Sequence, residues 1–165
     1  MSAADPRTPS AQDALELLSD AQDELLELFD RYDELVADDA DADQRRELAG
    51  QVCSLLAVHV EIKRALLYPA ARDALDDASL VDEVVESHAA LDETLADLEA
   101  ADPADPRHDA GVRVLQELFV DAMEQERTRL YPALRASELD LETLGGELAE
   151  MEERLLDADD ELGTD

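Results

Sequence analysis

The sequence predicts an all-α protein, arranged as an up-down-up-down four-helix bundle with a short fifth helix at the C-terminal end. Glycine and proline number only 5 and 6 among 165 residues, and leucine, alanine and acidic residues dominate, which favours helices. Apolar residues recur at helical spacing in four long stretches joined by short connections. The chain also repeats itself, because the residues Leu67–Ala70 recur 63 positions later as Leu130–Ala133. A chain of this length suits one domain with a substantial core.

The first helix is expected to follow a short N-terminal tail. Residues 1–9 are predicted to be a disordered tail, and residues 10–156 are predicted to form the bundle. Ser10 and Asp13 have the spacing of a capping box at the start of a helix. Leucine, phenylalanine and tyrosine at helical spacing then extend this helix to about Ala37, before an acidic loop at residues 38–43.

The second and third helices form the middle of the chain. The second helix is predicted from about Gln44 to Leu75. Pro69 is expected to bend or interrupt it, because proline lacks a backbone N–H and clashes with the preceding turn. Ser79 together with Asp82 is predicted to cap the third helix, which runs to about residue 101.

The fourth helix is predicted to start at a proline turn. Asp105 has the character of an N-cap and Pro106 that of a first helical residue, and the helix then runs to about Ala136. The fifth helix is predicted from about Leu141 to Leu156, with loosening at residues 145–146, where two glycines stand together. Residues 157–165 are predicted to be an acidic tail.

The repeat aligns two pairs of diagonal helices in this bundle. Offsets of 63 for the second and fourth helices and 66 for the first and third align apolar positions spaced alternately by 4 and 3 residues. Such positions form a seam that faces the bundle axis. Polar residues interrupt the seam at one height, where the aligned pairs are Gln22 with His88, His59 with Ala122, and Lys63 with Glu126.

The interrupted positions are predicted to form a buried polar layer without metal. His59 and Lys63 share one helix face because they are four residues apart. Lys63 and Glu126 precede a Tyr-Pro pair by the same number of residues, so they lie at matching height. A charge in an apolar bundle must be paired, and we therefore expect a Lys63–Glu126 ion pair. Gln22, His59 and His88 can satisfy the remaining donors and acceptors.

Six short motifs follow one another along the helices: Leu28–Tyr32, Leu56–His59, Leu67–Pro69, Glu86–His88, Gln125–Glu126 and Leu130–Pro132. In this order they resemble the hemerythrin-like HHE cation-binding proteins over most of the chain, from about Asp13 to Gly146. That resemblance implies a four-helix bundle around a non-heme di-iron site. It also implies one histidine ligand from each of the first and third helices and a His-x-x-x-Glu pair from each of the other two.

Three of the six ligand positions that the resemblance implies carry other residues. Gln22 and Ala122 stand where the family has histidines, and Lys63 stands where a bridging glutamate belongs. A protonated ammonium cannot ligate a metal, and its charge opposes a cation. We therefore expect that di-iron function is lost, that no cofactor is bound, and that Lys63 supplies the positive charge that metals once supplied.

Two other readings of the layer stay open. His59, His88 and Glu126 remain from the ligand set, and two histidines with one carboxylate can hold a single non-heme iron or a zinc ion. Such a site would handle oxygen, nitric oxide or peroxide, or would sense iron. Lys63 could also act as a catalytic amine, although the neighbouring Glu126 would keep it protonated.

Charge and composition restrict the partners. The net charge of −32 disfavours nucleic acid and anionic membranes. The low lysine content, one lysine against twelve arginines, suggests a GC-rich or salt-adapted source. Cys53 is the only cysteine, residues 1–10 lack a signal-peptide pattern, and no uncharged apolar run reaches the ~20 residues of a membrane span. We expect a cytoplasmic protein.

The predicted function is that of a non-enzymatic structural, binding or regulatory module. Its partner would be an unidentified protein or a second copy of the chain. The remaining polar and aromatic candidates have structural interpretations. Cys53 is expected to pack beside the seam, His108 to be a solvated residue at a helix start, and Tyr68 and Tyr131 to pack where two helices bend.

Overall fold

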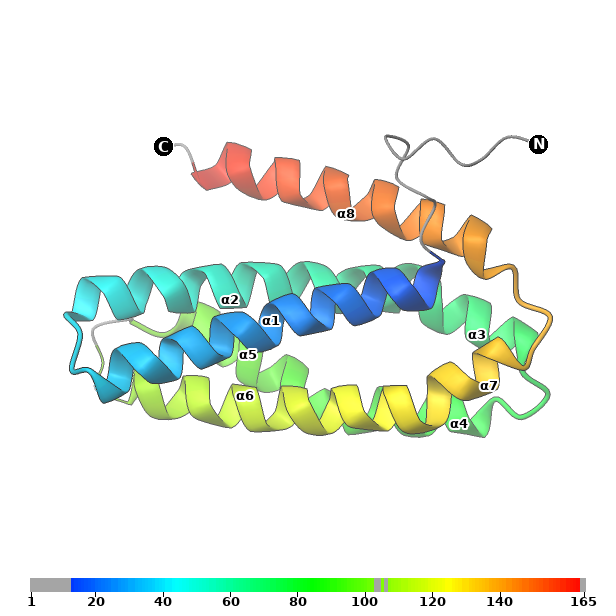
Figure 1. Cartoon of the computed structure of the whole chain (residues 1–165), viewed down its shortest axis with the longest axis horizontal. Coiled ribbons are helices and arrows are strands. Elements are labelled where there is room, and N and C mark those ends of the chain that lie inside the picture. The colour runs from blue at the N-terminus through cyan, green and yellow to red at the C-terminus, as the bar shows by residue number, and fades with distance from the viewer. Residues whose placement is uncertain (1–12, 103–104, 106, 164–165) are drawn as a thin grey trace, which may run out of the picture.

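The computed structural model describes residues 13–102, 105 and 107–163, and describes side chains no further than residue 158. Within these ranges the chain is helical apart from short connections, and no strand occurs. The helices form four antiparallel arms, and one further helix lies across them (Figure 1). The prediction of an all-α up-down-up-down bundle with an appended helix is therefore confirmed.

Each arm of the bundle consists of one to three consecutive helical segments. The first arm is α1 (Ala14–Ala37), and the second is α2 (Ala42–Ile62), η1 (Lys63–Leu67) and α3 (Tyr68–Ala74). The third arm is α4 (Ser79–Ser87) and α5 (Ala89–Ala100), and the fourth is α6 (His108–Gln125), η2 (Glu126–Leu130) and α7 (Tyr131–Arg135). The appended helix is α8 (Leu141–Gly163).

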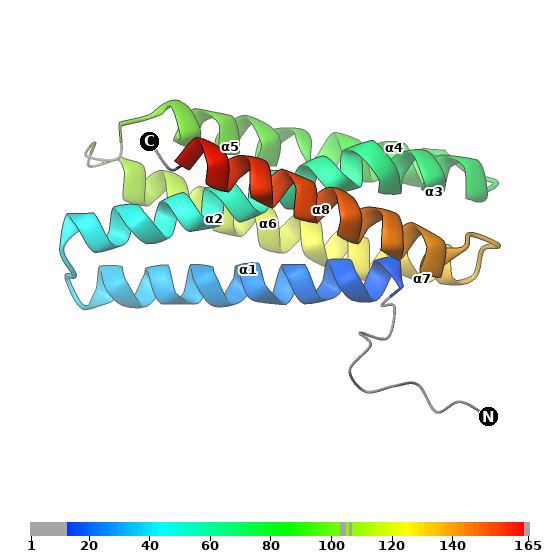
Figure 2. The same ribbon diagram turned by 90° about the horizontal axis from the view of Figure 1, so that it is seen from above.

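The helix α8 covers one side of the bundle. It packs against α1, α2 and η1 and crosses α2 obliquely, so that its C-terminal half reaches toward α5 (Figure 2). The predicted fifth helix was too short, because α8 passes through the glycine pair at 145–146 without interruption. It ends seven residues after the predicted end at Leu156, within the segment that was predicted to be an acidic tail.

Two widened turns lie at equivalent positions in the second and fourth arms. The segments η1 and η2 are π-helical, and the amides of Tyr68 and Tyr131 donate to the carbonyls of Lys63 and Glu126, five residues earlier. A proline follows each tyrosine. Because a proline ring clashes with the carbonyl four residues before it, a wider turn accommodates the ring and keeps the arm continuous. The predicted bend at Pro69 is therefore a π-helical turn that begins at Lys63.

The helix caps differ in part from the sequence-based prediction. The carboxylate of Asp13 itself caps α1 and accepts from the amide of Glu16 at 2.9 Å, while Ser10 lies outside the described residues. The cap predicted from Ser79 and Asp82 is wrong, because the Asp77 carboxylate, two residues before Ser79, accepts from the amide of Ser79.

Two further helix ends were predicted imperfectly. The third arm breaks at His88, whose amide donates to the carbonyls of Val84 and Val85. The fourth arm starts at His108, two residues later than predicted, although the Asp105 carboxylate does accept from the amide of Arg107. Pro106 and the predicted tail at residues 1–9 lie outside the part of the chain that the structure describes.

The core consists of two apolar clusters with a polar layer between them. One cluster contains Phe29 and Phe119, whose ring centroids are 5.7 Å apart, and the other contains Leu67 and Leu130. Along α1, Leu25 belongs to the first cluster and Leu18 to the second, with buried Gln22 between them.

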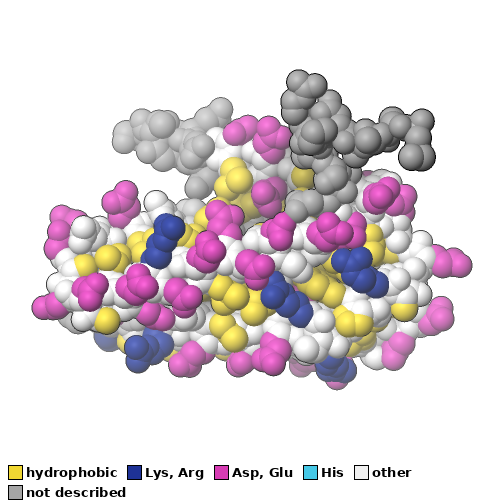
Figure 3. All heavy atoms as spheres, viewed as in Figure 1, with side chains coloured by type: hydrophobic (Ala, Val, Ile, Leu, Met, Phe, Trp, Pro, Cys, Tyr) yellow, Lys and Arg dark blue, Asp and Glu magenta, His cyan; other side chains and the backbone are white. Residues whose placement is uncertain are grey.

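The visible face in Figure 3 carries many acidic side chains and few basic ones, in line with the net charge of −32. None of the described helices is long and apolar enough to cross a lipid bilayer.

Candidate functional site

A buried ion pair lies at the centre of the polar layer. The Lys63 Nζ atom is 2.8 Å from the Glu126 Oε1 atom, and the two side chains are only 3% and 1% exposed. The two residues open the π-helical turns η1 and η2, so each arm presents its charged residue to the bundle axis at the same height. Each charge is the counter-ion of the other, which is what allows either of them to be buried.

The Glu126 carboxylate accepts hydrogen bonds through both of its oxygens. Its Oε1 atom accepts from Lys63 and also from Gln22 Nε2 at 3.3 Å. Its Oε2 atom accepts from the Tyr68 hydroxyl at 3.1 Å. Three donors from two arms therefore disperse the negative charge, and hydrogen bonds to an ionised acceptor are stronger than those between neutral groups.

Gln22 connects the layer to the first arm and to the surface. Its side chain is fully buried, and its Nε2 group donates to Glu126 and to the Tyr131 hydroxyl, the latter at 3.1 Å. Its Oε1 atom accepts from Arg127 Nε at 3.0 Å, and Arg127 also bonds to the carboxylate of Asp23 at the surface. The amide is thus satisfied at both ends, which fixes its orientation.

Tyr68 joins His88 to the polar layer. The Tyr68 hydroxyl has one proton, which it donates to Glu126, and it lies 3.0 Å from His88 Nδ1. The Tyr68 hydroxyl therefore connects the His88 ring to the Glu126 carboxylate. Burial, then the charge and hydrogen bond of Glu126, raise the pKa of Tyr68 well above its usual value, so Tyr68 keeps its proton.

Both histidines of the layer are neutral at physiological pH. Burial and the charge of Lys63 lower the pKa of His88 to about 4. The same two causes, with a smaller contribution from His88, place the pKa of His59 well below its ordinary value. The formal charges of Lys63 and Glu126 therefore cancel, and the imidazoles add none.

His59 is the least satisfied member of the layer. Its ring lies edge-on to Phe119, with centroids 6.4 Å apart, and borders a cavity of about 120 Å³ beneath α8. Both of its ring nitrogens, like His88 Nε2, are buried without a hydrogen-bond partner among the described residues. Ala122 is also buried, on the turn before Glu126, and its methyl group offers no polar contact.

All six predicted positions are buried, but they are not equally connected. Lys63, Glu126 and Gln22 are bonded directly, and His88 joins them through Tyr68. His59 and Ala122 make no side-chain hydrogen bond with described residues.

Sequence reasoning missed three members of the network and misplaced one histidine. The hydroxyls of Tyr68 and Tyr131 and the guanidinium of Arg127 all bond to layer residues, whereas the two tyrosines were predicted only to pack at bends. A signal was present, since each tyrosine follows a layer residue by five positions in both repeats. The prediction of a solvated His108 is wrong, because this side chain is buried against the second arm.

The layer as folded does not fit a bound cation. Both Glu126 oxygens already accept hydrogen bonds, and the Lys63 ammonium occupies the position beside one of them. Across the described residues, no three or more histidine, cysteine or acidic side chains are grouped so that they could hold a metal ion. The buried nitrogens without partners on His59 and His88 are the remaining groups with ligand character.

Comparisons with known proteins give a consistent result. The sequence model of the hemerythrin HHE cation binding domain matches residues 13–134. Among solved structures, the fold is similar to a crystal structure of a hemerythrin HHE cation binding domain-containing protein from Mycobacterium kansasii. The TM-score is 0.74 and the sequence identity 21%, with 93% of each chain covered, so this likeness shows a shared fold. A search of curated proteins found no match.

Proposed function

Because the chain belongs to the hemerythrin HHE cation-binding domain family, we propose that it is a member in which a buried Lys63–Glu126 ion pair replaces the metal. It acts in the cytoplasm as a non-enzymatic structural, binding or regulatory module. The observation that carries this proposal is the 2.8 Å contact between the Lys63 ammonium and the Glu126 carboxylate, both almost fully buried.

The ion pair supplies the charge balance that a cation would otherwise supply. An isolated carboxylate at 1% exposure would be costly, and the ammonium of Lys63 compensates it at hydrogen-bond distance. Gln22 and Tyr68 donate to the same carboxylate. The charges in the core are therefore balanced without a metal ion. A protein partner or a second copy of the chain is recognised by residues on the surface.

A second candidate is a reduced site for a single iron or zinc ion. The observation in its favour is that His59 and His88 carry buried, neutral ring nitrogens without partners among the described residues. Neutral imidazole is a good ligand for both metals. Such a site also needs Glu126, so Lys63 would have to move away from it.

Metal content separates the two candidates. The full chain is incubated anaerobically with excess Fe(II), desalted, and assayed for iron per chain together with its visible spectrum. Iron near zero without oxo-bridge absorption supports the ion-pair core. About one iron per chain, lost in His59→Ala or His88→Ala, supports the reduced site. Two irons per chain would overturn both.

A further inference from the structure

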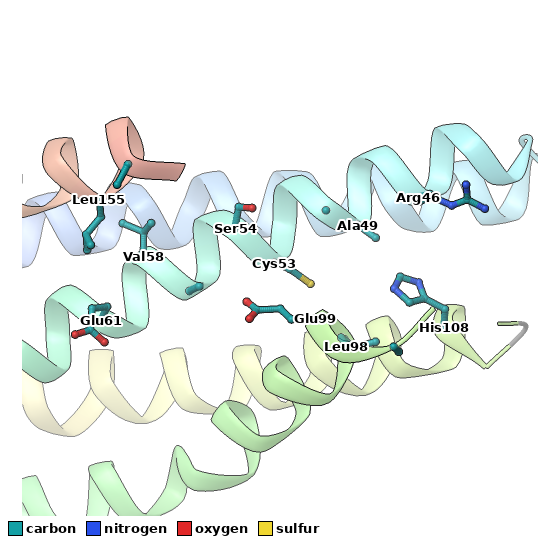
Figure 4. Close-up of a pocket in the computed structure, with 14 residues that line it drawn as sticks. Arg46, Ala49, Cys53, Ser54, Val58, Glu61, Leu98, Glu99, His108 and Leu155 are labelled. Carbon is teal, nitrogen blue, oxygen red and sulfur yellow. The ribbon is translucent and has the colours of Figure 1, made fainter. Parts of the chain in front are cut away.

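The cavity beneath α8, which His59 borders, lies between α1, α2 and α8 and measures about 120 Å³. That volume exceeds the ~30 Å³ share of one water molecule and is smaller than the ~300 Å³ of drug-sized sites, so it suits a ligand of a few heavy atoms. A larger groove beside α2 is more open, and its Glu99 carboxylate is exposed to solvent (Figure 4). The smaller cavity is therefore the better candidate for a binding site.

The most deeply buried polar group of the cavity is an unsatisfied imidazole. His59 is only 3% exposed, and neither of its ring nitrogens has a hydrogen-bond partner among the described residues. A neutral imidazole carries one N–H donor and one lone pair in either tautomer. A buried polar group without a partner is costly, and such groups are rare in native structures. A ligand that donates an N–H to the lone pair of His59 would satisfy this acceptor.

Two carboxylates line the same cavity from opposite helices. Glu24 comes from α1 and is exposed, whereas Glu152 comes from α8 and is partly buried. Neither carboxylate forms an ion pair with a residue that the structure describes. Burial and then the charge of Glu24 raise the pKa of Glu152, so the two groups are close enough to repel each other. A cation in the cavity would relieve this repulsion.

A single metal ion does not fit these three groups. No three histidine, cysteine or acidic side chains in the described part of the chain are grouped closely enough to hold one. A cation that contacts both the imidazole and a carboxylate therefore has to be polyatomic, with N–H donors at two separate positions. The remaining walls are apolar and include Leu25, Leu55 and Leu156, against which a flat ligand can pack. Amidinium and guanidinium groups are planar and carry N–H donors on separate nitrogens.

We propose that this cavity binds a small planar cation of the amidinium or guanidinium type. One N–H of the ligand donates to the imidazole of His59, and another donates to the Glu152 carboxylate. Glu24 adds a second negative charge beside the ligand. The site goes beyond the function proposed above, and it leaves the Lys63–Glu126 ion pair in place. Because the ligand contacts all three surrounding helices, its binding also strengthens the attachment of α8 to α1 and α2.

Three small probes separate the effects of charge and of hydrogen bonding. The full chain, labelled with ¹⁵N, is titrated at pH 7 and physiological salt with acetamidinium, with its uncharged isostere acetamide, and with tetramethylammonium, a cation without N–H donors. We expect acetamidinium to shift the amide resonances of Ala21, Leu55 and Leu156 saturably, and to bind at least about tenfold more tightly than the other two probes. Equal binding of acetamide or tetramethylammonium, or no saturable shift with acetamidinium, would overturn the proposal.

Variants distinguish the cavity from general attraction to an acidic surface. Glu152→Gln should weaken acetamidinium binding about tenfold, because a charge-assisted hydrogen bond becomes a neutral one. His59→Leu should weaken it to a similar extent by removing the acceptor. Glu153→Gln is the matched control, since it removes the same charge from an exposed position of α8 outside the cavity, and binding should match the wild type.

The partly exposed position of Glu152 keeps the test decisive if His59→Leu fails to fold. The ¹⁵N spectrum of each variant without probe shows whether the bundle is intact. Wild-type affinity in a folded Glu152→Gln variant would refute the site, as would an equal loss of affinity in Glu153→Gln.

Discussion

Lys63 and Glu126 illustrate how burial changes the energetic meaning of one contact. Arg129 and Glu83 form an ion pair at the surface with the same 2.8 Å separation, but their side chains are about half exposed. Water solvates the exposed pair whether or not it forms, whereas either member of the buried pair depends on the other. The two ion pairs have the same N–O distance, but loss of one partner is expected to destabilise the protein far more in the buried pair.

Replacing the lysine by an apolar residue tests this dependence. Lys63→Met should lower the free energy of unfolding by about 3–5 kcal/mol, because Glu126 loses its counter-ion in an apolar core. Lys63→Met combined with Glu126→Gln should recover most of that loss. Arg129→Met, the matched surface control, should cost less than about 1 kcal/mol. Urea unfolding measures all of these variants, and equal costs for the two single substitutions would contradict the argument.

A second substitution at the same position tests the replacement of metal by lysine. Lys63→Glu should destabilise the metal-free protein, since two carboxylates then face each other without a counter-ion. The same variant should gain affinity for Fe(II) or Zn²⁺, because it restores a glutamate that the family resemblance implies. Thermal unfolding with and without metal reports both effects. A variant with wild-type stability and no bound metal would show that both expectations are wrong.

The residues of the layer were partly predictable from the sequence. The repeat placed Lys63 opposite Glu126 and Gln22 at the height of His88 without structural information. The contact of Tyr68 with the polar layer was not predicted, because in an ordinary α-helix a residue five positions after Lys63 points away from the seam. The π-helical turn closes between residues five apart, and it returns Tyr68 to the face that carries Lys63.

At the scale of helices, α8 brings an unfavourable charge against the bundle. Glu152 of α8 is partly buried beside the His59 cavity, and Glu24 of α1 lines the same cavity. Burial and the charge of Glu24 raise the pKa of Glu152. A carboxyl whose pKa is raised by folding contributes less stability as the pH rises through that pKa, so α8 is docked at a cost at neutral pH.

Removing this charge should strengthen the attachment of α8. Glu152→Gln should raise the free energy of unfolding at pH 7 by about 0.5 kcal/mol, as expected for relief of a partly exposed like-charge pair. The neighbouring Glu153→Gln, at an exposed position of the same helix, is the control and should change little. Thermal unfolding at pH 7 and pH 4 should show a smaller gain for Glu152→Gln at pH 4. A gain that is equal at both pH values would contradict the electrostatic cause.

Helix ends were less predictable than helices. Periodic apolar residues specified all five helical stretches, because burial of one face determines where a helix packs. The extent of α8 was missed because an acidic run is compatible with a solvated tail or with a solvated helical turn, and composition does not separate them. The break at His88 was not predicted, because no glycine or proline lies near it in the sequence.

For the whole molecule, the dominant electrostatic quantity is the net charge of −32. Such a charge repels itself in the compact state, and salt screens that repulsion. The melting temperature should therefore rise with added NaCl, most steeply at low concentration. Between 0.01 and 0.1 M, the Debye length falls from ~30 to ~10 Å. Calorimetry over this range checks the effect. An increase confined to molar salt would point to general exclusion of salt from the protein surface instead.

The overall topology followed from the sequence more completely than the placement of α8. Four long helices joined by short connections predicted the up-down order of the bundle, and the two offsets agreed with its diagonal pairs of arms. The helix α8 has no counterpart in the repeat. Its apolar side could have covered any face of the bundle, and only the folded structure shows it against α1 and α2.

The polar layer between the two apolar clusters also restricts sliding of the arms along one another. Apolar side chains in a bundle tolerate displacement by one helical turn, because one leucine replaces another at little cost. Displacement of the second arm by one turn would separate Lys63 from Glu126 and bury both charges alone. The single lysine of the chain therefore fixes the relative position of the arms along the bundle axis. It selects one alignment of the helices from several that hydrophobic packing alone would permit.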